Sequence, residues 1–128
     1  MLRKALTGLF FLATLTACEE IFEVTDISEE QVTLLAPTNE STLTTSSVSF
    51  NWDGVAEADA YLVQIATPNF ENATQFVLDT IVVVDSTFVG NRLIRNLTDN
   101  TYQWRVQAQN SDFATGFSTA SFTVATGN

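Results

Sequence analysis

The chain has 128 residues, of which 45% are hydrophobic; it carries a formal net charge of −10 and contains no histidine. This length accommodates one domain, and the hydrophobic share excludes wholesale disorder. The excess of carboxylates repels phosphate backbones and so excludes nucleic acid as a partner. Without histidine, the chain lacks the usual acid–base catalyst at neutral pH and the commonest metal ligand.

The first seventeen residues have the pattern of an export signal. Residues 1–4 form a short basic head, and residues 5–17 form a mostly apolar run. A run of about 13 residues is too short to cross a bilayer core of roughly 30 Å as a helix. A basic head, an apolar run and small residues before a cleavage point are typical of a secretory signal peptide. We therefore expect residues 1–17 to be removed.

The apolar run ends in Leu15-Thr16-Ala17-Cys18, which resembles the lipobox of bacterial lipoproteins. The resemblance implies cleavage before Cys18, lipidation of its sulfur and a mature chain that contacts the membrane through its lipid. The alternative is an ordinary signal peptide followed by a cysteine by chance. Because Cys18 is the only cysteine, the chain cannot form an internal disulfide and must be stabilised by packing.

Acidic residues follow the cysteine, and six of the twelve residues in 19–30 are Asp or Glu without a sustained strand or helix period. We expect residues 18–30 to be a lipidated tether that spans on the order of 20 Å if flexible and up to about 40 Å if stretched. Acidic residues directly after the lipid cysteine resemble the surface-export signal of lipoproteins in the Bacteroidota phylum. The resemblance implies an outer-membrane protein exposed at the cell surface. A solvated linker, with the domain on the periplasmic face, is the alternative.

From residue 31 to residue 126, short β-rich runs alternate with polar turns, which predicts one all-β sandwich of about seven strands. The strands are expected at residues 32–35, 47–52, 60–67, 75–84, 87–93, 101–110 and 119–125, with a turn at 39–42. Period-two alternation directs one set of apolar side chains inward: Val48, Phe50, Trp52, Tyr61, Val63, Ile65, Tyr102, Trp104, Val106, Ala108, Phe122 and Val124.

Trp52, Tyr61 and the run Trp104-Arg-Val-x-Ala-x-Asn110 two residues after Tyr102 resemble a fibronectin type III domain over residues 33–125. Residues 61–67, followed by an aromatic at position 70, resemble the variant common in Bacteroidota surface proteins. The resemblance implies an immunoglobulin-like β-sandwich of the fibronectin type III type. It also implies that the Tyr102 hydroxyl bonds back to the preceding corner. The third-to-fifth-strand region is short, which leaves its sheet assignment open.

The sequence offers few side chains that could act in catalysis. Lysine is absent after Lys4, and without histidine no base is available to activate a nucleophile. Asp53, Glu57 and Asp59 are the only local carboxylates that could serve glycoside hydrolysis or bind Ca²⁺. Their spacing matches no calcium loop, and we expect them to be solvated turn residues. The sequence predicts a protein that is not an enzyme and needs no metal or cofactor.

Loop aromatics offer one candidate binding surface. Phe70, Phe113 and Phe117 lie between the expected strands. They either plug the ends of the sandwich or stack on sugar rings, as in a carbohydrate-binding module. The second use defines the alternative function of a sugar-binding surface protein.

The apolar run at residues 75–84 offers another candidate surface. Alternation places Phe76, Leu78, Val82 and Val84 on one face and Val77, Ile81 and Val83 on the other. One face can enter the core, and the other faces solvent unless a partner covers it. In this fold the run lies at or near a sheet edge, which can accept an added strand. We therefore expect Val77, Ile81 and Val83 to bind a partner. The alternative is that a bulge or a loop folds Ile81 and Val83 inward.

These features predict a lipid-anchored envelope or surface protein without enzymatic activity. Its sandwich binds a protein or a glycan, or it acts as a structural spacer in an envelope complex. Composition and pattern do not choose between these roles.

Overall fold

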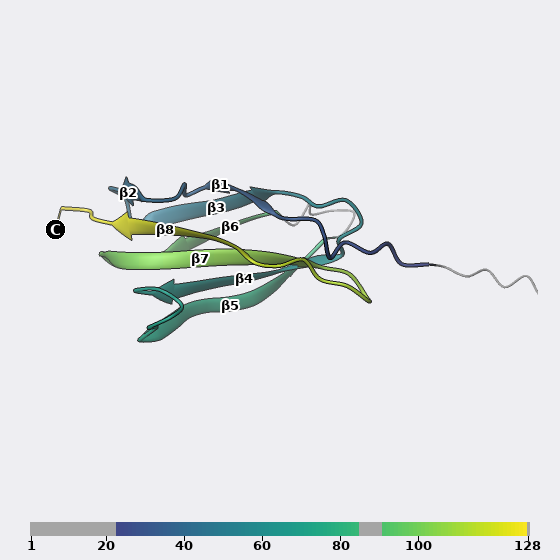
Figure 1. Cartoon of the computed structure of the whole chain (residues 1–128). Helices are drawn as coiled ribbons and strands as arrows, with labels where there is room; N and C mark the ends of the chain where they lie inside the picture. Colours follow the sequence, from purple (N-terminus) through teal and green to yellow (C-terminus); the bar gives the residue numbers. More distant parts are fainter. Residues whose placement is uncertain (1–22, 85–90, 128) are drawn as a thin grey trace, which may run out of the picture.

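The computed structural model describes residues 23–84 and 91–127, and all of their regular structure is β. The strands are β1 (Thr33–Ala36), β2 (Ser41–Leu43), β3 (Ser47–Asp53), β4 (Ala60–Thr67), β5 (Gln75–Val83), β6 (Arg92–Asn96), β7 (Asn100–Gln109) and β8 (Ser118–Val124). A three-stranded sheet, ordered β1-β3-β6, packs on a five-stranded sheet, ordered β2-β8-β7-β4-β5 (Figure 1). The predicted signal peptide, Cys18 and residues 19–22 lie outside the described residues.

The predicted β-sandwich is confirmed, and its core is aromatic. Phe50 and Trp52 of β3 meet Trp104 of β7 between the sheets, and the ring centroids of Phe50 and Trp104 lie 5.0 Å apart in an edge-to-face arrangement. Tyr102 stacks on Phe122 of β8 at 5.4 Å. Every side chain that alternation directs inward on β3, β4, β7 and β8 is buried. No helix able to cross a membrane occurs in residues 23–84 or 91–127.

Three strand predictions need correction. The first strand begins at Thr33 instead of residue 32. The predicted turn at 39–42 is partly strand, because Ser41–Leu43 pairs in parallel with β8. The predicted strand at 87–93 falls partly on residues 85–90, which the structure does not describe, and the observed strand is β6, Arg92–Asn96. Pairing with β3, in which Leu93 lies opposite Phe50, sets this later position.

The segment before β1 is part of the domain. Ile27, which the sequence analysis assigns to the tether, is only 1% exposed and belongs to the hydrophobic core. Asn110 Nδ2 donates to the Thr25 carbonyl at 2.8 Å, and the Glu30 amide donates to the Ile27 carbonyl at 2.9 Å. These contacts hold the chain on the sandwich from Thr25 onward.

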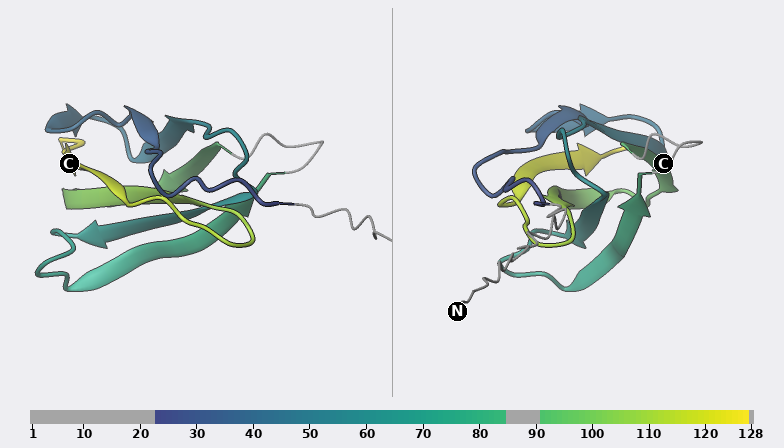
Figure 2. Two further views of the ribbon diagram at one scale, coloured as in Figure 1. Left: turned by 45° about the vertical axis from the view of Figure 1, so that its right-hand side comes forward. Right: turned by 90° about the vertical axis from the view of Figure 1, so that its right-hand side faces the viewer.

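The two ends of the sandwich carry different segments. The segment that begins at residue 23 enters at one end, beside the β3–β4 and β7–β8 connections, and we call this the proximal end (Figure 2). The β4–β5 connection, the β6–β7 corner and residue 127 lie at the opposite, distal end. The start of the described chain and the distal loops therefore lie a full strand length apart.

Candidate functional site: the outer face and free edge of the five-stranded sheet

Strand β5 forms one edge of the five-stranded sheet, because β4 is its only partner among the described strands. Its outer face carries Asp79 and three exposed apolar side chains: Phe76, Ile81 and Val83 are 44%, 52% and 57% exposed. Ile81 lies opposite Leu62 and Val83 opposite Ala60 on β4. The alternative that folds Ile81 and Val83 into the core is therefore wrong. An edge strand with exposed apolar side chains is a surface that partners can cover.

A β-bulge at Val77 changes the predicted grouping of side chains on this strand. Leu78 pairs with Ile65 and Phe76 pairs with Ala66, so Val77 is an additional residue between them. The extra residue shifts the alternation. Val77 consequently packs against the core, and the placement of Val77 with Ile81 and Val83 was wrong. Phe76, which was predicted to face inward, joins the outer face instead.

Two of the predicted loop aromatics meet on the same outer face. The guanidinium carbon of Arg105 lies 3.9 Å from the ring centroid of Phe70 and 4.2 Å from that of Phe117. Phe76 contacts Phe70 edge to face, with centroids 5.5 Å apart. Cation–π attraction of this kind is worth about 0.5–2 kcal/mol, depending on how far the cation is desolvated. The stack therefore holds both loop rings against the sheet.

A row of polar side chains crosses three strands beside this stack. Arg105 Nε donates to Gln64 Oε1 at 2.8 Å, and Gln64 Nε2 donates to Asp79 Oδ1 at 3.1 Å. The three residues lie opposite one another in the register of β7, β4 and β5. The row links the Arg105 cation to the Asp79 carboxylate through one amide and orients the guanidinium between the two rings.

Phe113 lies elsewhere, at the proximal end. It is partly buried and packs against the core. Its amide donates to Asn110 Oδ1 at 2.8 Å, and its carbonyl accepts from the Asn110 amide at 2.9 Å. This compact turn makes Phe113 a plug for the end of the sandwich, as one of the two sequence interpretations expected.

The three carboxylates singled out in the sequence lie at the end of β3 and in the β3–β4 connection. Asp53, Glu57 and Asp59 are all exposed. In the described part of the chain, no three acidic, cysteine or histidine side chains are close enough together to hold a metal ion. The loop is instead ordered by Tyr61, whose hydroxyl accepts a hydrogen bond from the Val55 amide at 2.8 Å.

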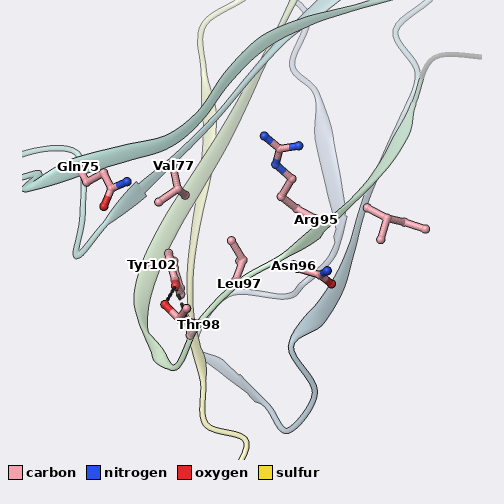
Figure 3. A pocket seen from close by; sticks show the side chains of 8 residues that line it. Gln75, Val77, Arg95, Asn96, Leu97, Thr98 and Tyr102 are labelled. Carbon is pink, nitrogen blue, oxygen red and sulfur yellow. Dashed lines mark hydrogen bonds between the residues drawn. The ribbon is translucent and has the colours of Figure 1, made fainter.

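A hollow of about 640 Å³ opens between the edges of the two sheets, and the sequence analysis did not anticipate it (Figure 3). Its lining comes from β5, β6, the following corner and β7: Gln75, Val77, Ile94, Arg95, Asn96, Leu97, Thr98 and Tyr102. The Tyr102 hydroxyl donates to the Thr98 carbonyl at 2.6 Å, which confirms the predicted bond to the corner. Arg95 is one of only three basic residues after Lys4, and this rarity is the one sequence signal that points here.

The comparisons with known proteins establish a similarity of fold. No protein-family model matches the chain, and no curated protein matches it. Among solved structures, it is similar to the fibronectin(III)-like modules of CbhA from Clostridium thermocellum, with 9% identity over 73% of this chain and 95% of that one and a TM-score of 0.50. The crystal structure of FN3tt gives 18% identity, 73% and 94% coverage and a TM-score of 0.50. A computationally redesigned β-sandwich protein gives 16% identity, 77% and 94% coverage and a TM-score of 0.51.

At these identities the likeness concerns the fold and leaves the ligand undefined. It agrees with the two-sheet topology, the buried aromatic core and the Tyr102 corner described above. The chain folds as an immunoglobulin-like β-sandwich of the fibronectin type III type.

Proposed function

We propose that this chain is a non-enzymatic, lipid-anchored protein of the bacterial outer membrane that presents its sandwich at the cell surface to bind another protein. The observation that carries the binding role is the apolar outer face of β5, where Phe76, Ile81 and Val83 are exposed on an edge strand. The lipid anchor follows from the Leu-Thr-Ala-Cys motif that ends at Cys18.

The short link between Cys18 and the domain supports a module held close to its membrane. Because the sandwich holds the chain from Thr25 onward, only residues 19–24 remain to separate it from Cys18. Six residues span at most about 20 Å when fully extended. The proximal end would then face the membrane, and the distal end would point away. The outer face of β5 runs along the side of the sandwich, where a neighbouring protein can reach it.

Charge favours a different protein over a second copy as the partner. Two copies that each carry a formal charge of −10 repel one another. Asp79 lies near the middle of β5, so antiparallel pairing of two β5 strands would bring their carboxylates together. A charge at this place is a common means of preventing edge-to-edge association.

The arrangement of the loop aromatics favours a protein over a sugar. Phe113 packs against the core and is not part of the outer face. The Arg105 guanidinium covers one face of Phe70 and one face of Phe117. Stacking on a sugar needs open ring faces, and this arrangement leaves fewer of them than three free loop aromatics would.

The anchor is tested by Cys18→Ala in cells fed an alkyne fatty acid. We expect the wild type to be labelled and to remain with the outer membrane, because acyl chains supply the membrane affinity. The variant should be unlabelled and recovered in the soluble fraction. Equal labelling of the two proteins would contradict the proposed anchor.

The docking face is tested by Ile81→Lys combined with Val83→Lys. Both side chains are exposed, so the free energy of unfolding in urea should change by less than about 0.5 kcal/mol per site. Leu35→Lys is the matched control, because Leu35 is 43% exposed but lies on the other sheet and does not line the hollow. A photocrosslinker placed at position 62 of each variant reports the contact on intact cells.

We expect the double variant to lose the crosslinked product that the wild type and the Leu35→Lys control form. A large loss of stability would assign Ile81 and Val83 to the core. Unchanged crosslinking in the folded double variant would show that the partner does not use this face.

A further inference from the structure

The hollow between the sheets has one charged residue among the described residues that line it, Arg95. Its side chain extends from β6 into the space toward β5 (Figure 3). The amide side chains of Gln75 and Asn96 stand on the same lining, and Val77 and Leu97 supply apolar surface. A cation flanked by amides and apolar groups matches the composition of sites that orient a polar ligand group. In a chain with a net charge of −10, an arginine whose pocket holds no acidic residue among those the structure describes is a distinctive feature.

Both long walls of this hollow are sheet edges. Among the described strands, β5 pairs with β4 alone and β6 pairs with β3 alone, so each has an unpaired side next to the hollow. An unpaired edge offers a row of backbone N–H and C=O groups that an extended chain can bond. The bulge at Val77 directs this side chain into the same space. The combination of free backbone groups and a pocket suits an extended peptide better than a small ion.

We propose that this hollow binds an extended peptide segment that adds to the free edge of β5 and places a carboxylate side chain on Arg95. Arginine and a carboxylate form two parallel hydrogen bonds, which fix the register of the added strand. Gln75 and Asn96 line the same hollow and can bond the peptide backbone. Because successive side chains of an extended strand point to opposite faces, the residues two positions before and after the acid would contact Val77 and Leu97. The proposal rests on the proposed binding role and adds the chemistry of the bound segment.

The experiment uses the full-length chain with Cys18→Ser, labelled with ¹⁵N, and the peptide Ac-Thr-Val-Glu-Val-Thr-NH₂. Its Glu→Gln analogue removes only the charge. We expect the acidic peptide to shift the backbone amides of residues 75–79 and the Arg95 Nε resonance, and to bind about ten-fold more tightly than the analogue, a difference of about 1.4 kcal/mol. Arg95→Gln should abolish this preference. Arg92→Gln is the matched control, because Arg92 is exposed on the same strand but does not line the hollow, and it should preserve the preference.

Equal affinity of the two peptides for the wild type would overturn the role of the carboxylate. If acetate shifts Arg95 Nε as strongly as the peptide does while the β5 amides stay unchanged, the hollow is an anion site and the peptide proposal fails. If neither peptide binds while crosslinking at the Ile81 face is intact, the peptide site in the hollow is refuted and the proposed function is not. Loss of the Ile81-dependent crosslink is what overturns the proposed function, so the two failures are distinguishable.

Discussion

Replacing Ile27 with alanine is expected to destabilise the domain as a core substitution would, although Ile27 lies in an acidic segment. The side chain is 1% exposed and contributes to the same cluster as the core aromatics. The change removes three carbons, which is about 2.4 kcal/mol of transfer free energy at roughly 0.8 kcal/mol per methylene, before the cavity is counted. Measured Ile→Ala losses of about 2–5 kcal/mol agree with this size.

Urea unfolding of the Cys18→Ser chain measures the effect. With a slope of about 1–3 kcal/mol per molar urea, a loss of about 3 kcal/mol lowers the midpoint by about 1–3 M. Ile94→Ala removes the same atoms from a position that is 58% exposed and should cost less than about 1 kcal/mol. Equal midpoints for the two variants would refute the burial of Ile27. The segment to residue 30 would then be a free tether, and the domain could move up to about 40 Å from residue 18.

Other consequences can be checked on the same protein. Trp104→Ala removes a fully buried ring and should cost about 3–5 kcal/mol in urea unfolding, and a loss below about 1 kcal/mol would show that the inward phase of β7 is wrong. Tyr102→Phe deletes the hydroxyl that donates to the Thr98 carbonyl at 2.6 Å and should lower stability by about 0.5–1.5 kcal/mol; an unchanged melting temperature would contradict a stabilising corner. The side-chain and backbone hydrogen bonds from Ser28 hold the pKa of Asp26 below 3.8. The stability that these hydrogen bonds contribute to the folded state is present above that pH and is lost as the pH falls through the lowered pKa of Asp26. Carboxyl NMR titration should find the low pKa in the wild type, the Ser28→Ala variant should move it toward 3.8, and equal values in both would refute the cause.

The inward faces of the long strands could be predicted because the alternation of consecutive residues identifies them. In β3 and β7, large apolar side chains alternate with polar ones, and a strand with one buried face has a single register that satisfies this pattern. The Tyr102 corner could also be predicted, since its hydrogen bond reaches back only four residues, to Thr98.

The candidate surfaces depended on pairing between distant segments. The bulge at Val77 arises where β5 is matched to Ile65 and Ala66 of β4, and nothing within residues 75–84 marks the extra residue. Strand β2 has only three residues, and its pairing with β8 supplies the order that its own sequence does not specify. Both errors arose because the pattern of neighbouring residues does not show which distant strand a segment pairs with.

The sequence by itself determined the all-β class and the aromatic core, because each depends on a period of two along neighbouring residues. The export and lipidation signals stay predictions. Only the tertiary structure decided that Ile27 is buried, that Arg105 lies between Phe70 and Phe117, and that Arg95 lines a hollow between two sheet edges. Each of these features joins side chains that are far apart in the chain. Their position is set by which strands pair and where a sheet ends, and backbone hydrogen bonding between distant segments decides both.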